Sequence, residues 1–479
     1  MPDRAPGPGE QYRFHFDMRK CIACKCCVVA CNEQNGNPAA INWRRVGEIE
    51  GGWYPSTTRS YLSMGCNHCL EPTCLQGCPV DAYTKDPVTG IVRHTAEACI
   101  GCQYCTWNCS YGVPQYNPER GVVGKCDMCH GRLSLGQAPA CVSACPQGAI
   151  QIEIVNAAEW RHACEAASPA SGVPIDDQSL STTRITVAEI APNARPVDST
   201  TCVTPEPPHW PLVIMTVLTQ LSVGAFATIW LLQLLGAPAR LGVAAVTSML
   251  VAGLALAAST LHLGRPIHAY RALKMYRRSW LSREVLLFTS FSVVAGLYAG
   301  MLWQGVPGGS VVGALTTALG LAGVTASSCI YRVPSRPAWN TSYTLLQFNV
   351  TAGLLGPLFA AAVGAGDRRA LAMAAATMAG AQFALIALGF FRFIASDVAE
   401  LKSTVRLLST VLAHRLLLRG VLLALGGVVL PLAGAGAAVA GLSLVLAVGA
   451  EILGRYLFFV SVVPKHLAAP YIAPASETV

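Results

Sequence analysis

The stretch CIACKCCVVAC, from Cys21 to Cys31, decides the fold of the first part of this chain, because it places five cysteines within eleven residues. Of the 20 cysteines in the 479-residue sequence, 17 lie between Cys21 and Cys145. Thiols at this density form a disulfide framework, bind zinc or bind iron–sulfur clusters. The spacing of the cysteines distinguishes these three possibilities.

Four groups of four cysteines have related spacings. Groups one and three read C-x2-C-x2-C-x3-C, group two reads C-x2-C-x4-C-x3-C, and group four reads C-x2-C-x11-C-x3-C. In chain order, the members are Cys21, Cys24, Cys27 and Cys31; Cys66, Cys69, Cys74 and Cys78; Cys99, Cys102, Cys105 and Cys109; and Cys126, Cys129, Cys141 and Cys145. A proline follows the last cysteine of groups two and four. Such spacings are typical of [4Fe-4S] ligands, so we expect four [4Fe-4S] clusters.

Disulfides and zinc fit this pattern less well. A disulfide framework needs an oxidising compartment, whereas the N-terminal segment MPDRAPGPGEQYRFHFDMRK lacks the apolar region of a signal peptide. Zinc sites use isolated pairs of C-x2-C knuckles. Cys26 fits none of the spacings, so we expect a packed bystander at this position rather than a ligand.

The geometry of cluster binding predicts how the groups work together. The C-x2-C loops wrap one cluster, and the fourth cysteine of a group, expected at the start of a helix, reaches a neighbouring cluster. Short β-prone runs separated by turn signals, as in CPVDAYTKDPVTGIVRH, are expected of a ferredoxin-type repeat. We therefore predict an α+β ferredoxin-like polycluster domain of two paired 2[4Fe-4S] modules over residues 1–175, followed by an extended linker over 176–208.

The second part of the chain has the composition of a membrane protein. The whole sequence is 53% hydrophobic and only 13% charged, and from Trp210 onward long apolar runs alternate with short connections. Runs of about 20 apolar residues span a bilayer. We expect an all-α eight-helix transmembrane bundle over residues 209–479, with spans near 211–235, 241–261, 285–303, 311–331, 345–365, 371–391, 420–440 and 442–463.

The distribution of basic residues predicts the orientation of the spans. Connections two, four and six and the C-terminal tail carry 14 basic residues, whereas the opposite side carries three. Basic connections stay in the cytoplasm, so we expect a multi-pass protein of the bacterial inner (plasma) membrane with its cysteine-rich domain in the cytoplasm. The net charge of +8 is therefore interpreted as a topology signal and not as a sign of nucleic-acid binding.

The membrane half offers few groups that could handle electrons. Histidine pairs within the spans, which a haem b would need, are missing, so a membrane quinone is the expected partner. In the segment STLHLGRPIHAYRAL, His262 at the cytoplasmic end of span two can hydrogen-bond a quinone carbonyl and exchange a proton. Arg265 and Glu284 lie close to it in sequence and complete the candidate quinone site. An interfacial histidine that only caps a helix is the alternative for His262.

Two further ionisable residues lie within the last span. Glu451 and Arg455 are four residues apart, which places them on one helix face. Ionisable groups within lipid are rare and are usually paired. We expect these two side chains to pair with each other and to serve the structure rather than the chemistry.

The cysteine-rich half resembles the four-cluster iron–sulfur subunit of the dimethyl sulfoxide (DMSO) reductase family of molybdoenzymes. The resemblance covers most of residues 12–200 and rests on CNHCLEPTCLQGCPVDAYTKDPVTGIV, CIGCQYCTWNCSYGVPQYN and KCDMCHGRLSLGQAPACVSACP. It implies that ligands are exchanged between groups. The implied ligand sets are Cys21, Cys24, Cys27 and Cys145; Cys31, Cys126, Cys129 and Cys141; Cys66, Cys69, Cys74 and Cys109; and Cys78, Cys99, Cys102 and Cys105.

The apolar half resembles the membrane anchor subunit of the same family over nearly all of residues 209–470, through HWPLVIMTVLTQ, LHLGRP, SREV, PAWNTSY and AEILGRYLFF. In that family the two subunits are usually separate chains. The resemblance implies a non-catalytic redox subunit that relays electrons between a molybdopterin-containing catalytic subunit and the quinone pool, of ubiquinone or menaquinone. A cytoplasmic cluster domain favours the sulfite-oxidising branch. The alternatives are a quinol-oxidising S-oxide reductase subunit and a membrane-tethered polyferredoxin without a molybdenum partner.

Overall fold

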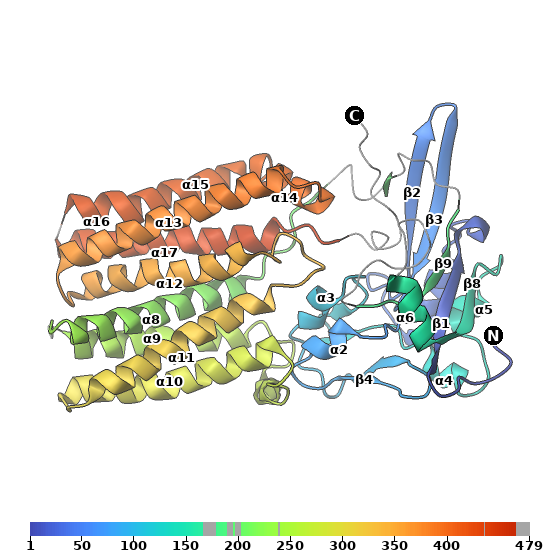
Figure 1. Ribbon diagram of the computed structural model, residues 1–479, viewed down its shortest axis with the longest axis horizontal. Helices are drawn as coiled ribbons and strands as arrows, with labels where there is room; N and C mark the ends of the chain where they lie inside the picture. The colour runs from blue at the N-terminus through green and yellow to red at the C-terminus, as the bar shows by residue number, and fades with distance from the viewer. Residues whose placement is uncertain (166–178, 189–194, 197–202, 238–239, 435, 466–479) are drawn as a thin grey trace. The chain divides into compact units, whose positions relative to one another are not determined.

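The computed structural model describes residues 1–165, 179–188, 195–196, 203–237, 240–434 and 436–465. It consists of two compact units (Figure 1). Unit 1 contains Met1–Val203 and Lys465–Val479, and unit 2 contains Thr204–Pro464. The predicted linker region 176–208 is only partly described, and each unit is treated separately below.

The described strands of unit 1 form four small sheets. In one of them, β1 lies between β8, which is antiparallel to it, and the parallel β9; in another, β2 pairs with β3 in a hairpin and with β10. The pairs β4–β5 and β6–β7 form two separate short hairpins. The strands are β1 (Glu10–Asp17), β2 (Arg45–Trp53), β3 (Ser56–Met64), β4 (Tyr83–Lys85), β5 (Val92–His94), β6 (Gln115–Asn117), β7 (Val122–Gly124), β8 (Ile150–Asn156), β9 (Arg184–Thr186) and β10 (Arg195–Pro196).

Short helices make up the rest of the regular structure described in unit 1. They are η1 (Met18–Lys20), α1 (Cys26–Asn35), α2 (Thr73–Gly77), α3 (Tyr104–Asn108), α4 (His130–Leu133), α5 (Ala140–Ser143) and α6 (Ala157–Glu165). The fourth cysteine of a group does not begin a helix, contrary to our expectation. It lies one helical turn after the third cysteine, which is at or next to the first residue of α1, α2, α3 or α5. The C-x3-C spacing is therefore the length of the helical turn itself.

The core of unit 1 combines apolar side chains with thiols. Phe14 and Phe16 point from the same face of β1 and are 3% and 1% exposed, as the two-residue period of a strand requires. Ile150 and Ile152 of β8 pack in the same cluster. Cysteines from groups one, two and four belong to this cluster as well. The cysteine loops are thus anchored in the hydrophobic core of unit 1 and do not lie free on its surface.

Unit 2 has eight helices, among the described residues, that are long and apolar enough to cross a membrane. They are α8 (Trp210–Leu234), α9 (Leu241–Thr260), α10 (Trp280–Gln304), α11 (Gly309–Ile330), α12 (Ser342–Val363), α13 (Arg368–Ile394), a seventh span over Ala413–Ala433 and α17 (Ala437–Val460). The seventh span is built of α15 (Ala413–Ala424), the π-helical turn η3 (Leu425–Val429) and α16 (Leu430–Ala433). The predicted fold class, an α+β ferredoxin-like domain followed by an eight-span bundle, is confirmed.

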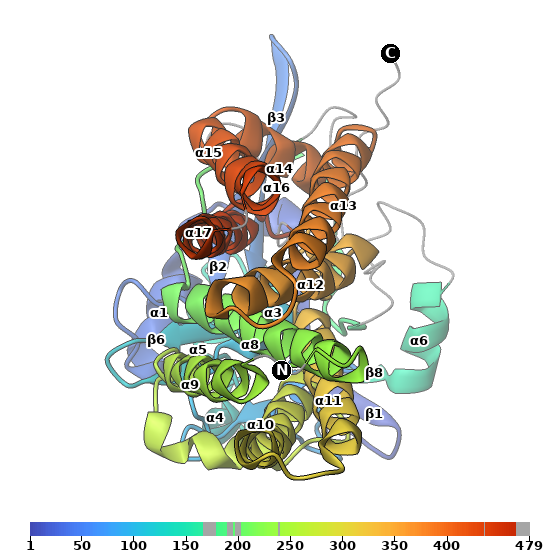
Figure 2. The same cartoon turned by 90° about the vertical axis from the view of Figure 1, so that its left-hand side faces the viewer.

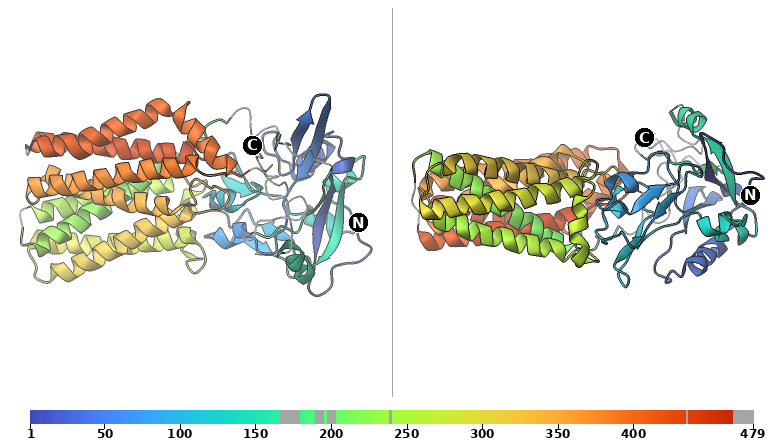
Figure 3. Two further views of the ribbon diagram at one scale, coloured as in Figure 1. Left: turned by 45° about the horizontal axis from the view of Figure 1, so that its top comes forward. Right: turned by 90° about the horizontal axis from the view of Figure 1, so that it is seen from below.

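The eight helices lie side by side in one bundle (Figures 1, 2 and 3). α8 contacts α9, α11, α12 and α17, and 83% of its apolar window is buried. Gly224 of α8 and Gly356 of α12 bring the two backbones together, because a Cβ built on Gly224 would lie 2.0 Å from the Ala352 carbonyl oxygen. Small residues allow this approach in membrane bundles.

Two elements between spans are not evident from the sequence, and the predicted seventh span is displaced by seven residues at each end. The connections contain η2 (Pro266–Leu273) and α14 (Ala399–Ser409). The seventh span begins at Ala413 and not near residue 420. Arg415 and Arg419, which the hydropathy pattern assigns to a connection, therefore lie within α15, where Arg415 stacks on Tyr456 and Arg419 is 8% exposed. Removing both from the count of 14 still leaves a large basic excess on that side.

Candidate functional site

The four C-x2-C loops of unit 1 share one unusual backbone conformation. The residue just before the second cysteine has a positive φ in every loop, with values of 58° at Ala23, 43° at His68, 70° at Gly101 and 58° at Met128. This left-handed conformation is unfavourable for residues other than glycine. It turns the backbone N–H inward: Gly101 N lies 3.4 Å from Cys99 Sγ, and Met128 N lies 3.4 Å from Cys126 Sγ.

The first and last cysteine groups line one pocket, and groups two and three line another. Each pocket is lined by four cysteines that the resemblance implies as one ligand set. We name the first of these set A and the other set D. Set A contains Cys21, Cys24, Cys27 and Cys145, and set D contains Cys78, Cys99, Cys102 and Cys105.

The other eight cysteines gather in two further sets, set B and set C. Thiols within each set interact electrostatically, as Cys31 does with Cys141 and Cys129, and Cys69 does with Cys66 and Cys109. Set B contains Cys31, Cys126, Cys129 and Cys141, and set C contains Cys66, Cys69, Cys74 and Cys109.

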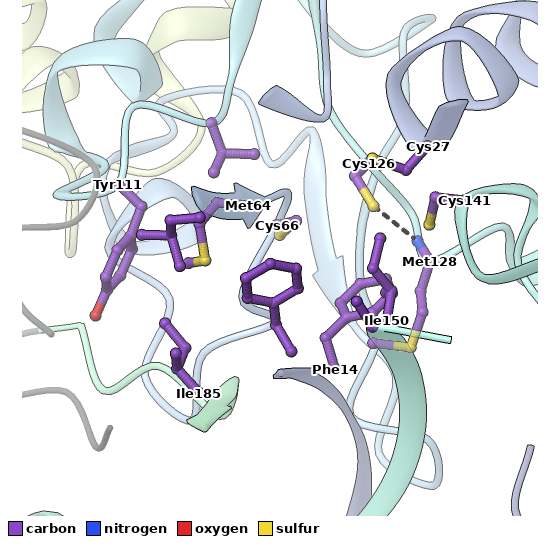
Figure 4. Close-up of a cluster of buried hydrophobic side chains, with 14 of the residues drawn as sticks. Phe14, Cys27, Met64, Cys66, Tyr111, Cys126, Met128, Cys141, Ile150 and Ile185 are labelled. Atoms are coloured by element: carbon purple, nitrogen blue, oxygen red, sulfur yellow. Dashed lines mark hydrogen bonds between the residues drawn. The ribbon is translucent and has the colours of Figure 1, made fainter. Parts of the chain in front are cut away.

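Thiols of neighbouring sets lie close enough to interact electrostatically, and this gives the sets an order. Cys27 of set A interacts with Cys141 of set B, and Cys126 of set B interacts with Cys66 of set C. Sets C and D are neighbours because each of them takes its cysteines from groups two and three. Figure 4 shows Cys27, Cys126 and Cys141 lying near one another. The order is therefore A, B, C, D.

The chemistry of these sets fits a cationic iron–sulfur core. Burial raises the pKa of Cys31 to about 12, of Cys102 to about 12 and of Cys109 to about 11. The thiolates that clusters require thus need a positively charged partner inside the fold. Among the described residues, no three Cys, His, Asp or Glu side chains could together hold a single metal ion.

Backbone and side-chain donors complete the surroundings of the sulfurs. Ala82 N donates to Cys78 Sγ at 3.3 Å, and Ala149 N donates to Cys145 Sγ at 3.3 Å. Asn35 Nδ2 donates to Cys31 Sγ at 3.7 Å. Hydrogen bonds of this kind tune the potentials of iron–sulfur clusters. Cys26 stands outside these arrangements, and it is exposed rather than packed, contrary to our expectation, because it forms the first residue of α1.

Sequence reasoning missed three buried polar side chains beside the cysteines. His68 is fully buried, its Nδ1 accepts from Val92 N at 3.0 Å, and burial lowers its pKa well below the usual value. Arg44 and Lys125 are each only 3% exposed. Nothing in the pattern distinguishes these cations from surface ones, although Lys125 directly precedes the first cysteine of group four.

The structure places the candidate quinone residues around the ends of α9 and α10. His262 follows the end of α9, and burial lowers its pKa to about 4, so the imidazole is neutral. Its Nδ1 is buried and has no hydrogen-bond partner among the described residues. His209, the N-cap of α8, interacts electrostatically with it. A half-buried, neutral imidazole beside the Ser259 backbone can also hydrogen-bond a carbonyl ligand.

The other two candidate residues lie on neighbouring elements. Arg265 caps η2, which packs against α10. Glu284 of α10 is 7% exposed and lies near Ser327 of α11. Within the part of the chain that the structure describes, His262 and Glu284 share no hydrogen bond. α9 and α10 pack against each other, so the three residues belong to one end of the bundle without direct contact between the two titratable groups.

Glu451 and Arg455 do not pair with each other, so that expectation is wrong. Glu451 accepts hydrogen bonds from Thr351 Oγ1 at 2.7 Å and from Gln382 Nε2 at 3.3 Å. Arg455 Nη2 donates to Gln220 Oε1 at 3.1 Å, and its guanidinium lies 3.6 Å from the centre of the Phe348 ring. The i,i+4 spacing predicts a common face correctly, but neighbouring helices supply better-placed partners than the same helix does.

A cysteine-rich α+β unit joined to eight apolar helices defines a membrane-anchored iron–sulfur electron-transfer subunit. Comparisons with known proteins make the class specific. Residues 57–155 match the 4Fe-4S dicluster domain, and residues 206–460 match the DMSO reductase anchor subunit (DmsC). The chain therefore belongs to the DMSO reductase anchor subunit family, with an iron–sulfur unit fused before the anchor.

The iron–sulfur unit has its own relatives. It is 37% identical over 166 residues to the B chain of the anaerobic DMSO reductase of Haemophilus influenzae, covering 33% of this chain and 80% of that protein. It is 35% identical over 199 residues to the probable anaerobic DMSO reductase chain YnfG of Escherichia coli K12, covering 40% of this chain and 94% of that protein. The B subunit of the sulfite dehydrogenase of Allochromatium vinosum is 33% identical to it over 160 residues, covering 29% of this chain and 67% of that protein. These relationships imply a catalytic subunit as partner, and the anchor makes the chain an integral membrane protein.

Proposed function

We propose that this chain relays electrons between a molybdopterin-containing catalytic subunit and the membrane quinone pool, using four [4Fe-4S] clusters held by sets A, B, C and D. The observation that carries the proposal is the gathering of 16 cysteines into four adjoining sets, two of them around pockets. Bound clusters supply one-electron transfer, and the chain's own residues hold them, exclude water and set their potentials.

The proposed quinone site is the end of the bundle that contains His262, Arg265 and Glu284. Neutral His262 would donate to or accept from the quinone head group, and buried Glu284 would take up or release a proton there. If this is so, His262→Ala abolishes quinone-linked electron transfer while iron content and cluster spectra stay unchanged. His268→Ala, in the same loop, serves as the control. Equal loss in both variants would argue against a specific role for His262.

For the direction of electron flow we propose sulfite oxidation, with electrons passing to quinone. The support is the basic excess on the connections that share a side with unit 1, which predicts a cytoplasmic cluster domain and hence a cytoplasmic catalytic subunit. The relationship to the sulfite dehydrogenase of Allochromatium vinosum is consistent with it. The second candidate is a quinol-oxidising S-oxide reductase, which the higher identity to the DMSO reductase of Haemophilus influenzae favours.

The first test is the composition of the complex purified through this chain in mild detergent. We expect molybdenum in a large co-purifying subunit, quinone reduction by sulfite, and no oxidation of quinol by DMSO. Quinol oxidation by S-oxides without sulfite activity would establish the second candidate. An isolated chain with iron and sulfide but no molybdenum partner would instead identify a membrane-tethered polyferredoxin.

A further inference from the structure

Unit 1 buries two full positive charges at the places where cysteine sets meet. Arg44 and Lys125 are each 3% exposed. A buried cation is costly unless negative charge lies close to it. The described surroundings of these two side chains contain thiols and carbonyl groups, and the nearest negative charges are therefore cysteine thiolates. This makes the position of each cation relative to the four sets informative.

Lys125 lies between set B and set C. Its Nζ donates to Cys66 Sγ of set C at 3.5 Å and to the carbonyl oxygen of Cys126, in set B, at 2.7 Å. A third bond, to the Val92 carbonyl oxygen, holds the ammonium group in place. The three acceptors around Nζ match the three N–H donors of an ammonium group. The side chain is thus built into the junction as a cation.

Arg44 lies between set A and set B. Its Nη1 donates to Ser63 Oγ at 3.2 Å, and this hydroxyl contacts Cys27 Sγ of set A at 3.4 Å. On the other side, the guanidinium interacts with Cys141 and Cys126 of set B. The Phe14 ring packs 4.7 Å from its Cζ atom, and its Nη2 is buried without a hydrogen-bond partner among the described residues. The guanidinium thus keeps an unused donor beside the thiols.

The junction between sets C and D is different. The side chain that interacts with both sets there is the buried phenol of Tyr83, whose electrostatic partners are Cys105, Cys74 and Cys78. A phenol is uncharged near neutral pH. The three junctions along the order A, B, C, D therefore hold an arginine, a lysine and a tyrosine.

We propose that Arg44 and Lys125 are positioning residues that raise the reduction potentials of the clusters on either side of them, Arg44 at sets A and B and Lys125 at sets B and C. The inference rests on the four ligand sets of the proposed function. A cluster gains one negative charge on reduction, and a nearby cation in a medium of low dielectric constant favours that state. Set B is flanked by both cations and should respond to either.

The test is a redox titration of the purified full chain, with each cluster followed by its electron paramagnetic resonance signal. Lys125→Met removes the charge at similar length, and Arg44→Met does the same at the other junction. At a fixed ambient potential we expect the reduced-to-oxidised ratio of two clusters to fall at least tenfold in each variant. This corresponds to a fall of about 59 mV in the reduction potential of a one-electron couple. One cluster should shift in both variants, and one in neither.

Charge-conserving and exposed variants serve as controls. Lys125→Arg and Arg44→Lys should leave the ratios within threefold of the original. Lys25→Met removes an exposed lysine directly beside Cys24, where solvent screens the charge, and should shift no cluster. The inference is wrong if both methionine variants keep all potentials at full iron content, or if Lys25→Met shifts them equally.

Iron content separates this inference from the proposed function. A wild-type chain with fewer than four clusters would overturn the ligand sets themselves. Four clusters with unmoved potentials would overturn only the role of the cations. Lys125→Gln, which is neutral and still able to donate to Cys66 Sγ, replaces Lys125→Met if that variant fails to assemble, and the same tenfold fall is expected of it.

Discussion

At the scale of single residues, the cysteine loops depend on a backbone conformation that the sequence hides. Ala23, His68, Gly101 and Met128 hold equivalent positions, and only one of them is glycine. A side chain in the left-handed region costs about 1–2 kcal/mol, so three of the four loops carry strain that the rest of the fold must support. Strain of this kind gathers at functional sites.

Substitutions at two of these positions should affect the stability of unit 1 differently, depending on whether they add or remove a side chain. Gly101→Ala adds a Cβ at φ of 70° and should lower the free energy of unfolding of unit 1 by about 1 kcal/mol. Ala23→Gly relieves the same strain and should leave stability unchanged or slightly higher. The thermal midpoint for loss of cluster absorbance measures both. A larger loss in Ala23→Gly than in Gly101→Ala would contradict this account.

The neutral imidazole of His262 gives unit 2 a dependence on pH. Its pKa is about 4 in the folded protein and about 6.5 when unfolded, so unfolding takes up a proton between these values. Stability should therefore fall as the pH is lowered from 6.5 to 4 and stay flat above 6.5. His262→Gln should remove part of this slope in thermal unfolding in detergent. An unchanged slope would mean that other titratable groups cause the pH dependence of stability.

At the scale of elements, the bundle depends on one close helix crossing. Gly224 of α8 and Gly356 of α12 meet through backbone atoms, so a side chain at either position would have to displace the backbone of the facing helix. Because α8 contacts four other helices, a shift of α8 is transmitted to much of unit 2.

Gly224→Ala should therefore destabilise unit 2 by about 1–3 kcal/mol. Gly253→Ala is the matched control, since nothing lies within 4 Å of a Cβ built on that glycine of α9. Thermal unfolding of both variants in the same detergent is the measurement. Similar midpoints for the two would mean that α8 and α12 separate without cost.

The sequence predicts elements better than it predicts their partners. Cysteine spacing and runs of apolar residues are local patterns, and they lead to the α+β domain and the eight spans. The predicted start of the seventh span is wrong because Arg419 is buried against Gly454, a tertiary contact that hydropathy cannot register. Glu451 and Arg455 have partners on other helices for the same reason. Arg44 and Lys125 were missed because charge alone carries no sign of burial.

At the scale of the whole molecule, the orientation in the membrane remains a prediction from charge. It can be tested with Cys26, which is exposed in unit 1 and belongs to none of the cysteine sets. A membrane-impermeant maleimide should label Cys26 in inverted vesicles and spare it in right-side-out vesicles. Cys26→Ser should remove the signal from the inverted vesicles. Labelling in right-side-out vesicles would place unit 1 outside and remove the basis for sulfite oxidation.

The four cysteine sets have an arrangement along the chain that bears on biogenesis. Set D lies within the sequence limits of set C, set C lies within those of set B, and set B lies within those of set A, like nested parentheses. The loop that must close is shortest for set D and longest for set A, which waits for Cys145. Iron–sulfur insertion can thus begin at the innermost site and end at the outermost, and a chain interrupted before Cys145 retains a complete inner site with an unfinished outer one.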